Sequence, residues 1–388
     1  MDGSAELFES ELLEIRVDPY SPAFRDTVRQ MLARHLEPST KIGLLHFTLD
    51  YAMYIGAICG VLFLQPMWAK ILCSVLAGIK MANLGTLGHD AAHGSLTGSS
   101  RLNTVLGVLC FLPGLYNYQM WQYDHHHVHH PNTNGDHFDS WKPYSKAEFD
   151  ALPPLRRWKE RFYRSSWGLG LASYYILERW WQVKFLPRGF LPQRFRAAAW
   201  GYFALVLGYL AAFLGALAAA PLYSHTGSAT ALILGFAVPF YIWMTLFSFT
   251  VYVQHTHKRI PWFDGAVDRK TAMPQEVLSL HLDFPLVMKK LMHNIYEHAA
   301  HHANVRIPFH RLADAQAELN ALIGDQAVSQ RFSFGWLHET LRDCRLYDYE
   351  NHQWLDFDGK PTGPIIVSGA QRDAMVRYGP GNRFVRQA

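Results

Sequence analysis

Three groups of closely spaced histidines carry the chemistry that this sequence suggests. The groups are His89-Asp-Ala-Ala-His93, His125-His-His-Val-His-His130 and His298-Ala-Ala-His301-His302. Residues at positions i, i+3 and i+4 of a helix point to one face, so each group directs two or three imidazole rings the same way. Imidazole rings that point together are ligands for a transition metal ion.

Chance does not account for this spacing. With 21 histidines in 388 residues, an HxxHH pattern arises roughly 0.06 times in a chain of this length, and here it occurs twice. One pair such as His89 and His93 can be ordinary, and a run such as 125–130 can be a fortuitous surface tract. Eight neutral rings brought together would suit two borderline transition metal ions. The sequence therefore predicts a histidine-rich dimetal site.

The second group leaves its ligands open. His126 completes an HxxHH pattern and His125 an HxxxHH pattern with the same two partners. We favour His126, with His125 or His127 as neighbours that orient the ligands. The ligands predicted from spacing are His89, His93, His126, His129, His130, His298, His301 and His302. The isolated histidines are interpreted as structural or surface residues: His35, His46, His225, His281, His310, His338 and His352.

Four apolar runs are long enough to cross a membrane. Residues Ala197–His257 contain no Asp, Glu, Lys or Arg and are divided only around Pro221–Thr230, which leaves two runs of roughly 22–25 residues. The first two runs, Ile42–Leu64 and Trp68–Leu87, form a predicted hairpin. The sequence therefore predicts four transmembrane helices.

One acidic and one basic residue interrupt the first hairpin. Asp50 lies in the first run, eight residues after Ile42, and Lys80 lies in the second, nine residues before His89. If both of these helix ends meet the same membrane face, each side chain lies about 12–14 Å deep. An unpaired charge at that depth is costly, and a pair on adjoining helices offsets much of the cost. We predict that the two side chains pair; the alternative is that Lys80 reaches the interface and Asp50 lies near the headgroups.

Charge bias predicts the orientation of the chain. Thirteen Lys and Arg residues lie between His89 and Arg196, and none lies in Pro221–Thr230, so the long loops and both termini are expected in the cytosol. Arg101–Tyr118 is too short to span and suits an interfacial or re-entrant hairpin, and Trp167–Phe185 suits the membrane surface. The net charge of +4 is too small to indicate nucleic acid binding.

These features predict an all-α integral membrane protein with four transmembrane helices, interfacial helices and a cytosolic helical cap that carries the dimetal site. The expected division is an N-terminal cytosolic segment at 1–41, a membrane domain at 42–257 and a C-terminal cap at 258–388. All three histidine groups meet the same membrane face in this arrangement, which allows them to converge.

The histidine groups and their surroundings resemble the integral-membrane fatty acid desaturase family from about Leu84 to Leu319. The segments His293-Asn-Ile-Tyr-Glu-His298, Arg306-Ile-Pro-Phe-His310 and Tyr252-Val-Gln-His255-Thr-His257 are similar to its Δ12/ω6 and ω3 branch. Two departures are the extra histidines at 125 and 127 and the first group HDAAHG, where Cys-Gly is common in that branch.

The resemblance implies two iron ions, O2 as co-substrate, electrons from an external donor, and desaturation of a fatty acyl chain in a buried tunnel. It adds His255 as a ligand and His257 as a weaker candidate. The resemblance leaves three carriers of the acyl group open: coenzyme A, a carrier protein or a membrane lipid. Because no HPGG haem-binding motif occurs, the implied donor is a separate ferredoxin or cytochrome b5-like protein.

Other side chains have candidate roles around such a site. Asp90 and Asp124 neighbour predicted ligands and are expected to orient them. The candidates for the substrate border are Asn117, Tyr118, Trp121 and Trp243. Hydroxylation, acetylenic bond formation and alkane oxidation on the same scaffold remain open, because they depend on the placement of one C–H bond. A histidine-rich metal transporter is a more remote alternative, since the charge-free Ala197–His257 region offers an ion no path.

Overall fold

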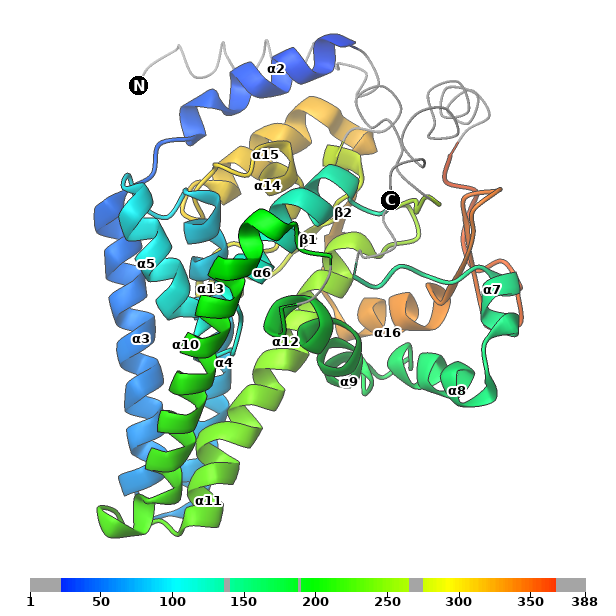
Figure 1. Cartoon of the computed structure of the whole chain (residues 1–388). Coiled ribbons are helices and arrows are strands. Elements are labelled where there is room, and N and C mark those ends of the chain that lie inside the picture. The colour runs from blue at the N-terminus through cyan, green and yellow to red at the C-terminus, as the bar shows by residue number, and fades with distance from the viewer. Residues whose placement is uncertain (1–21, 136–139, 188–189, 265–274, 368–388) are drawn as a thin grey trace.

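Four long apolar helices form the body of the protein. The computed structural model describes residues 22–135, 140–187, 190–264 and 275–367. The helices long and apolar enough to span a membrane are α3 (Thr40–Phe63), α4 (Met67–His93), α10 (Gln193–Ala218) and the continuous segment Ser228–His255. That segment consists of α11 (Ser228–Leu232), the π-helix η6 (Ile233–Ala237) and α12 (Val238–His255). Figure 1 shows these helices side by side, with the remaining elements gathered at one end. The prediction of four spans is confirmed.

The boundaries of the first two spans follow from local sequence. The Ser39 hydroxyl caps the start of α3 by accepting from the Ile42 backbone N–H at 3.4 Å, and Pro66 precedes α4. α4 continues through three internal glycines, at positions 78, 85 and 88, to Gly94, whose φ of +74° suits glycine and ends the helix. The predicted second span ended at Leu87, whereas α4 continues to His93. The first histidine group therefore lies on the last turns of the spanning helix and does not follow it.

The predicted pairing of Asp50 with Lys80 is confirmed. The Lys80 ammonium donates to Asp50 Oδ1 at 2.8 Å, and both residues are buried between α3 and α4. The other carboxylate oxygen, Oδ2, lies 2.6 Å from Nε2 of His293, which arrives from the C-terminal part of the chain. The spans and the cap are thus joined by a buried polar contact.

A chain of short helices lies at the histidine end of the spans. The helix α5 (Ser100–Phe111) packs beside α4, and the chain turns at residues 112–117 into α6 (Tyr118–Tyr123). The π-helix η2 (Asp124–His129) and the 3-10 turn η3 (His130–Asn132) continue from it. Further along, α9 (Leu171–Tyr174) runs into a second π-helix, η4 (Tyr175–Phe185).

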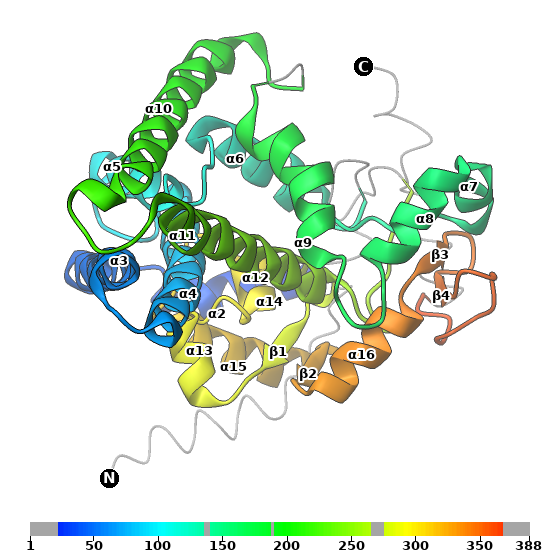
Figure 2. The same ribbon diagram turned by 90° about the horizontal axis from the view of Figure 1, so that it is seen from below.

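The remaining elements form the cap over this end. Its α-helices are α2 (Pro22–Leu32), α7 (Lys146–Ala151), α8 (Pro154–Tyr163), α13 (Leu286–Leu291), α14 (His298–Ala303), α15 (Leu312–Ile323) and α16 (Phe334–Asp343). Short 3-10 turns of the cap are η1 (Ala33–His35), η7 (Gln275–Val277) and η8 (Gly324–Gln326), whereas η5 (Ala220–Leu222) lies in the loop between α10 and α11, at the opposite end of the spans. Three-residue strands pair as β1 (His281–Asp283) parallel to β2 (Ser329–Arg331) and β3 (Leu346–Asp348) antiparallel to β4 (Gln353–Leu355). The view along the spans shows α14 near α4 and α12 (Figure 2).

Candidate metal centre

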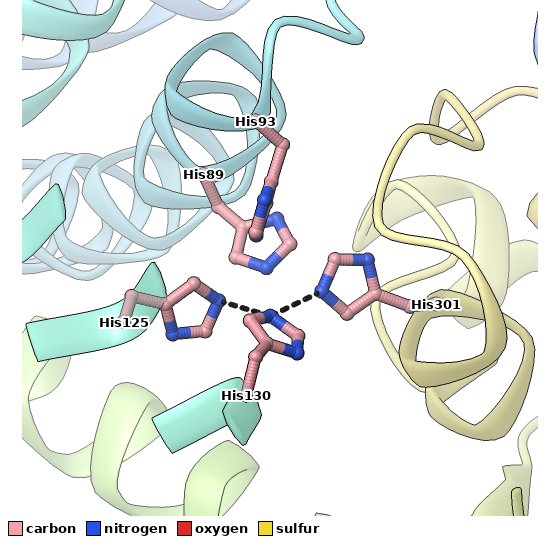
Figure 3. Close-up of side chains that lie close together, drawn as sticks. All are labelled: His89, His93, His125, His130 and His301. Carbon is pink, nitrogen blue, oxygen red and sulfur yellow. Dashed lines mark hydrogen bonds between the residues drawn. The ribbon is translucent and has the colours of Figure 1, made fainter. Parts of the chain in front are cut away.

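Five histidines from three parts of the chain form the first group of ring nitrogens. One donor nitrogen from each lies within 4.8 Å of all the others, and the members are His89, His93, His125, His130 and His301. In Figure 3 the rings converge on one point, with Nε2 of His130 lying 3.1 Å from that of His125 and 3.2 Å from that of His301. The end of α4, the η2–η3 segment and α14 supply these rings.

Four further histidines form a second group by the same distance criterion: His129, His255, His298 and His302. Nε2 of His298 lies 2.9 Å from Nε2 of His255 and 2.9 Å from Nε2 of His302. His255 comes from the last turn of α12. The two groups are adjacent, because the ring centroids of His130 and His302 are 4.5 Å apart.

The division between the groups follows from helix geometry. Consecutive residues of an α-helix are about 100° apart around the axis, so adjacent histidines diverge. His301 accordingly joins the first group, whereas His302 joins the second with His298, its neighbour at i−4. The adjacent pair His129 and His130 is divided in the same way. The two members of each HH pair therefore belong to different donor groups.

The histidine run at residues 125–130 departs from the α-helical spacing. In a π-helix, residues five apart share a face, and η2 brings His125 into contact with His130. His126, which we favoured on α-helical spacing, is in neither donor group. Its ring nevertheless lies 4.4 Å from that of His93, and its buried Nε2 has no hydrogen-bond partner among the described residues. The geometry thus favours His125 in the place that the sequence assigned to His126.

Burial keeps the rings available to a metal ion. Burial first, and then the neighbouring histidines, hold the pKa of His125, His130, His298, His301 and His302 well below the usual value of 6.5. The rings are therefore neutral near pH 7, as nitrogen ligands must be. Nε2 of His89 and of His93 is buried with no partner among the described residues, which is costly unless a cation accepts the lone pair. An all-imidazole donor set fits a borderline divalent metal ion.

Neighbouring groups orient several rings. Asp90 Oδ1 lies 3.2 Å from Nδ1 of His89, and its Oδ2 accepts from the Phe309 backbone N–H at 2.7 Å. This places Asp90 in the orienting role predicted for it and turns Nε2 of His89 toward the group. Two partners were not predicted: the Leu278 carbonyl, 3.3 Å from His255 Nδ1, and the Thr133 hydroxyl, 3.4 Å from His302 Nδ1. Neither carries a sequence signal, because a carbonyl is common to all residues and Thr133 matches no motif.

Comparison with known proteins identifies the family of this chain. The family model described as "Fatty acid desaturase" matches residues 66–334. The chain belongs to the fatty acid desaturase family. It is 26% identical over 298 residues to an sn-1 oleoyl-lipid 12-desaturase of Picosynechococcus, covering 76% of this chain and 79% of that protein. The predicted family is thereby confirmed, and this desaturase-family chain is an enzyme of the oxidoreductase class.

Two other relatives bear on the branch. An omega-6 fatty acid desaturase from the chloroplast of Spinacia oleracea is 25% identical over 291 residues, which cover 74% of this chain and 61% of that protein. An sn-1 acyl-lipid omega-3 desaturase (ferredoxin) of Synechocystis is 26% identical over 295 residues, which cover 74% of this chain and 78% of that one. These relatives agree with the likeness to the Δ12/ω6 and ω3 branch.

An internal cavity of this desaturase runs from the histidine groups along α12. Its lining includes five histidines, three charged residues and several apolar side chains; the histidines are His89, His125, His129, His255 and His298, and the charged residues are Asp124, Arg179 and Lys184. Trp243 lies twelve residues before His255, which is about 18 Å along a helix. The lining residues on α12 between them are Leu246, Phe247, Thr250, Val251 and Gln254. The cavity therefore leads from the metal-ligand groups into the membrane-spanning part.

Trp243 forms a wall of this cavity. A Cβ atom at Gly85 would lie 2.3 Å from its ring, and one at Gly114 would lie 2.7 Å from its Nε1, so both positions require glycine for the indole to fit. Of the residues predicted at the substrate border, Trp121 and Trp243 line the cavity. Asn117 instead caps α6, and Tyr118 packs against Tyr202 with ring centroids 5.6 Å apart.

Other predicted residues lie elsewhere. His257 is in neither donor group; its Nδ1 accepts from the Arg259 backbone N–H at 3.1 Å, and burial together with Arg259 lowers its pKa to about 4. Asp124 pairs with Lys184 and, at 3.6 Å, with Arg179. The sequence analysis named His293 only as part of a family-like segment and gave it no role; in the structure it is the partner of Asp50.

Proposed function

We propose that this protein uses O2 at a di-iron centre to introduce a double bond into a fatty acyl chain of a membrane lipid. The observation that carries the proposal is the cavity, which connects both histidine groups with the apolar interior of the spans. The acyl-lipid substrate is favoured over coenzyme A or carrier-protein esters because the relatives are named as acyl-lipid desaturases.

The proposed ligands are the nine histidines of the two groups, with His126 as the alternative to His125. Two iron ions held there would supply the activation of O2. The overall reaction converts –CH2–CH2– to –CH=CH–, while O2, two electrons and two protons join the two hydrogens removed to form two molecules of water. Iron is preferred to zinc or copper because of the family, since imidazole binds all three.

The protein's own share is to place the chain and exclude water. An acyl chain has no polar group near the reacting carbons, so shape alone must bring the methylenes to the centre. Trp121 and Phe247 supply apolar walls and Trp243 narrows the cavity. The neutral, buried rings add no charge beyond that of the metal ions.

The electrons come from a separate donor protein in this proposal. A relative is named as ferredoxin-dependent, which makes a ferredoxin the first donor to test and a cytochrome b5-like protein the second. The ligand end of the spans is assigned to the cytosol on the Lys/Arg bias.

The test is expression of the full chain in a host of known fatty acid profile, with a ferredoxin system, followed by mass spectrometry of the lipids. We expect a new double bond that disappears in His301→Ala. His225→Ala serves as the matched control, because His225 is exposed in the loop at the opposite end of the spans. A hydroxylated or acetylenic product would replace desaturation by that reaction, and no oxygen-dependent product would refute the proposal.

A further inference from the structure

The helix α6, which leads into the histidine run at residues 125–130, is fixed at its beginning. The Asn117 backbone N–H donates to the Lys184 carbonyl at 2.8 Å, and its side-chain amide donates to the Ala199 carbonyl at 2.8 Å. The Asn117 side chain also caps α6 by accepting from the Met120 N–H. The first turn of α6 is therefore attached to both η4 and α10.

The same segment is fixed at its end. The Thr133 hydroxyl donates to the His129 carbonyl at 3.0 Å. The Asn134 side chain donates to the Pro261 carbonyl at 3.1 Å, and the Phe263 N–H donates to the Asn134 carbonyl at 2.8 Å. The contacts of Asn117 and Asn134 thus fix both ends of the segment. The wider π-turn between them takes up one residue more than an α-helical turn would.

Lys184 holds the position at which the π-turn begins. Its ammonium donates to Asp124, the first residue of η2, and it lies 5.4 Å above the ring of Trp121. Arg179 adds an ion pair to the same carboxylate, and all three charged side chains are buried. Since the Lys184 carbonyl also binds Asn117, one residue contacts both ends of α6.

The register that begins at Asp124 decides which ring enters the first group. In the π-register His125 meets His130, and its ring stacks on Trp121 with centroids 4.4 Å apart. In an α-helical register, residues four apart share a face, so His126 would meet His130 instead of His125. The two candidate rings flank His93, at 5.0 and 4.4 Å between centroids, so a shift of one residue would exchange them.

We propose that Lys184, through its ion pair with Asp124, is a positioning residue that holds the π-register of η2 and thereby selects His125 over His126 as a metal donor. The inference rests on the dimetal centre proposed above. Without the ion pair the wide turn moves out of η2 toward the start of α6, because the attachments at both ends keep the number of residues between them. Residues 126–130 then take the commoner α-register, and His126 takes the place of His125.

The test compares ligand variants in two backgrounds. The purified full chain is stripped with a chelator and titrated with Fe2+ without oxygen. In the wild type, His125→Ala should weaken one of two iron sites by at least about 10-fold, and His126→Ala should leave both within about 3-fold. In Lys184→Met the order should reverse. Absorption spectra of the Co2+-loaded variants give a second readout, because they report the number of ligands.

Two further variants complete the design. Lys184→Arg should restore the wild-type order, because it keeps the cation. Lys70→Met is the matched control: it removes another buried ammonium, bonded to Thr226 at the opposite end of the spans, and should keep the wild-type order. Asp124→Asn breaks the same ion pair from the other side and must give the same reversal, including when Lys184→Met does not fold.

The failures are distinguishable. An unchanged order in Lys184→Met or Asp124→Asn, or a wild type that depends on His126, overturns the register inference while the dimetal centre stands. A wild type that binds no stoichiometric Fe2+ overturns the proposed function and the inference together.

Discussion

The buried contact among Asp50, Lys80 and His293 gives the sharpest test of how the spans are held together. Asp50→Asn leaves the Lys80 ammonium, 5% exposed, without the carboxylate that lies 2.8 Å away. Removing one partner of a buried ion pair costs about 3–5 kcal/mol, which is roughly two to four orders of magnitude in the unfolding equilibrium. The expected result is a large fall in the unfolding free energy.

Lys80→Met should cost less, because the structure gives the carboxylate a second partner. Asp50 Oδ2 remains 2.6 Å from His293 Nε2, so the carboxylate keeps a hydrogen-bond partner after the ammonium is removed. The expected cost is about 1–3 kcal/mol. In Asp50→Asn/Lys80→Met both charges are gone, so the double variant should be more stable than Asp50→Asn alone.

The assay is equilibrium unfolding of the full chain in one detergent, followed by loss of helical signal. Lys41→Met is the control, because Lys41 is an exposed lysine at the start of the same helix and should change stability by less than about 0.5 kcal/mol. The reasoning is refuted if the double variant is no more stable than Asp50→Asn, or if Lys80→Met is the more damaging single change.

Three further outcomes are expected. Trp243→Leu should open the cavity wall and shift the lipid products toward longer acyl chains; an unchanged product profile would show that this indole does not limit chain length. Gly85→Val should abolish the product without loss of the folded chain, because its Cβ would lie 2.3 Å from the Trp243 ring; full activity would contradict the close contact. The metal-free chain should lose stability as pH falls from 7 to 5: burial lowers the pKa of His298 and His301 in the folded state, so the unfolded state, with an ordinary pKa near 6.5, binds more protons there. Each ring contributes at most about 1.4 kcal/mol per pH unit, and a melting temperature that is flat or rises on acidification would argue against neutral buried rings.

The spans and the meeting of the histidines were predictable because both depend on patterns that are local in sequence. Apolar runs of sufficient length identify spans without any knowledge of their neighbours. The end of α4 was placed too early because apolar character fades after Leu87, whereas the helix continues to the glycine at position 94. Hydrogen bonding, and not hydropathy, ends the helix there.

The finer details of the site were not predictable, because they depend on contacts between distant segments. His293 and Asp50 are 243 residues apart, and no spacing rule connects them. The preference for His126 assumed α-helical geometry. Five of the six residues from 125 to 130 are histidines, so the sequence offers a ring for either helical spacing and does not distinguish them. Only the attachments of this segment to Lys184, Ala199 and Pro261 give a reason for the wider turn.

The two histidine groups cannot be assembled independently, and this follows from which segments they share. The η2–η3 segment gives His129 to one group and His130 to the other, and α14 divides His301 and His302 in the same way. Rotation of either helix about its axis would move one ring of each adjacent pair toward its group and the other away. A rotation of η2 about its axis therefore alters both groups at once, although each retains ligands from α4 or α12. The attachments at the ends of this short helix thus matter to the whole centre, because they fix the one rotation on which both sets of donors depend.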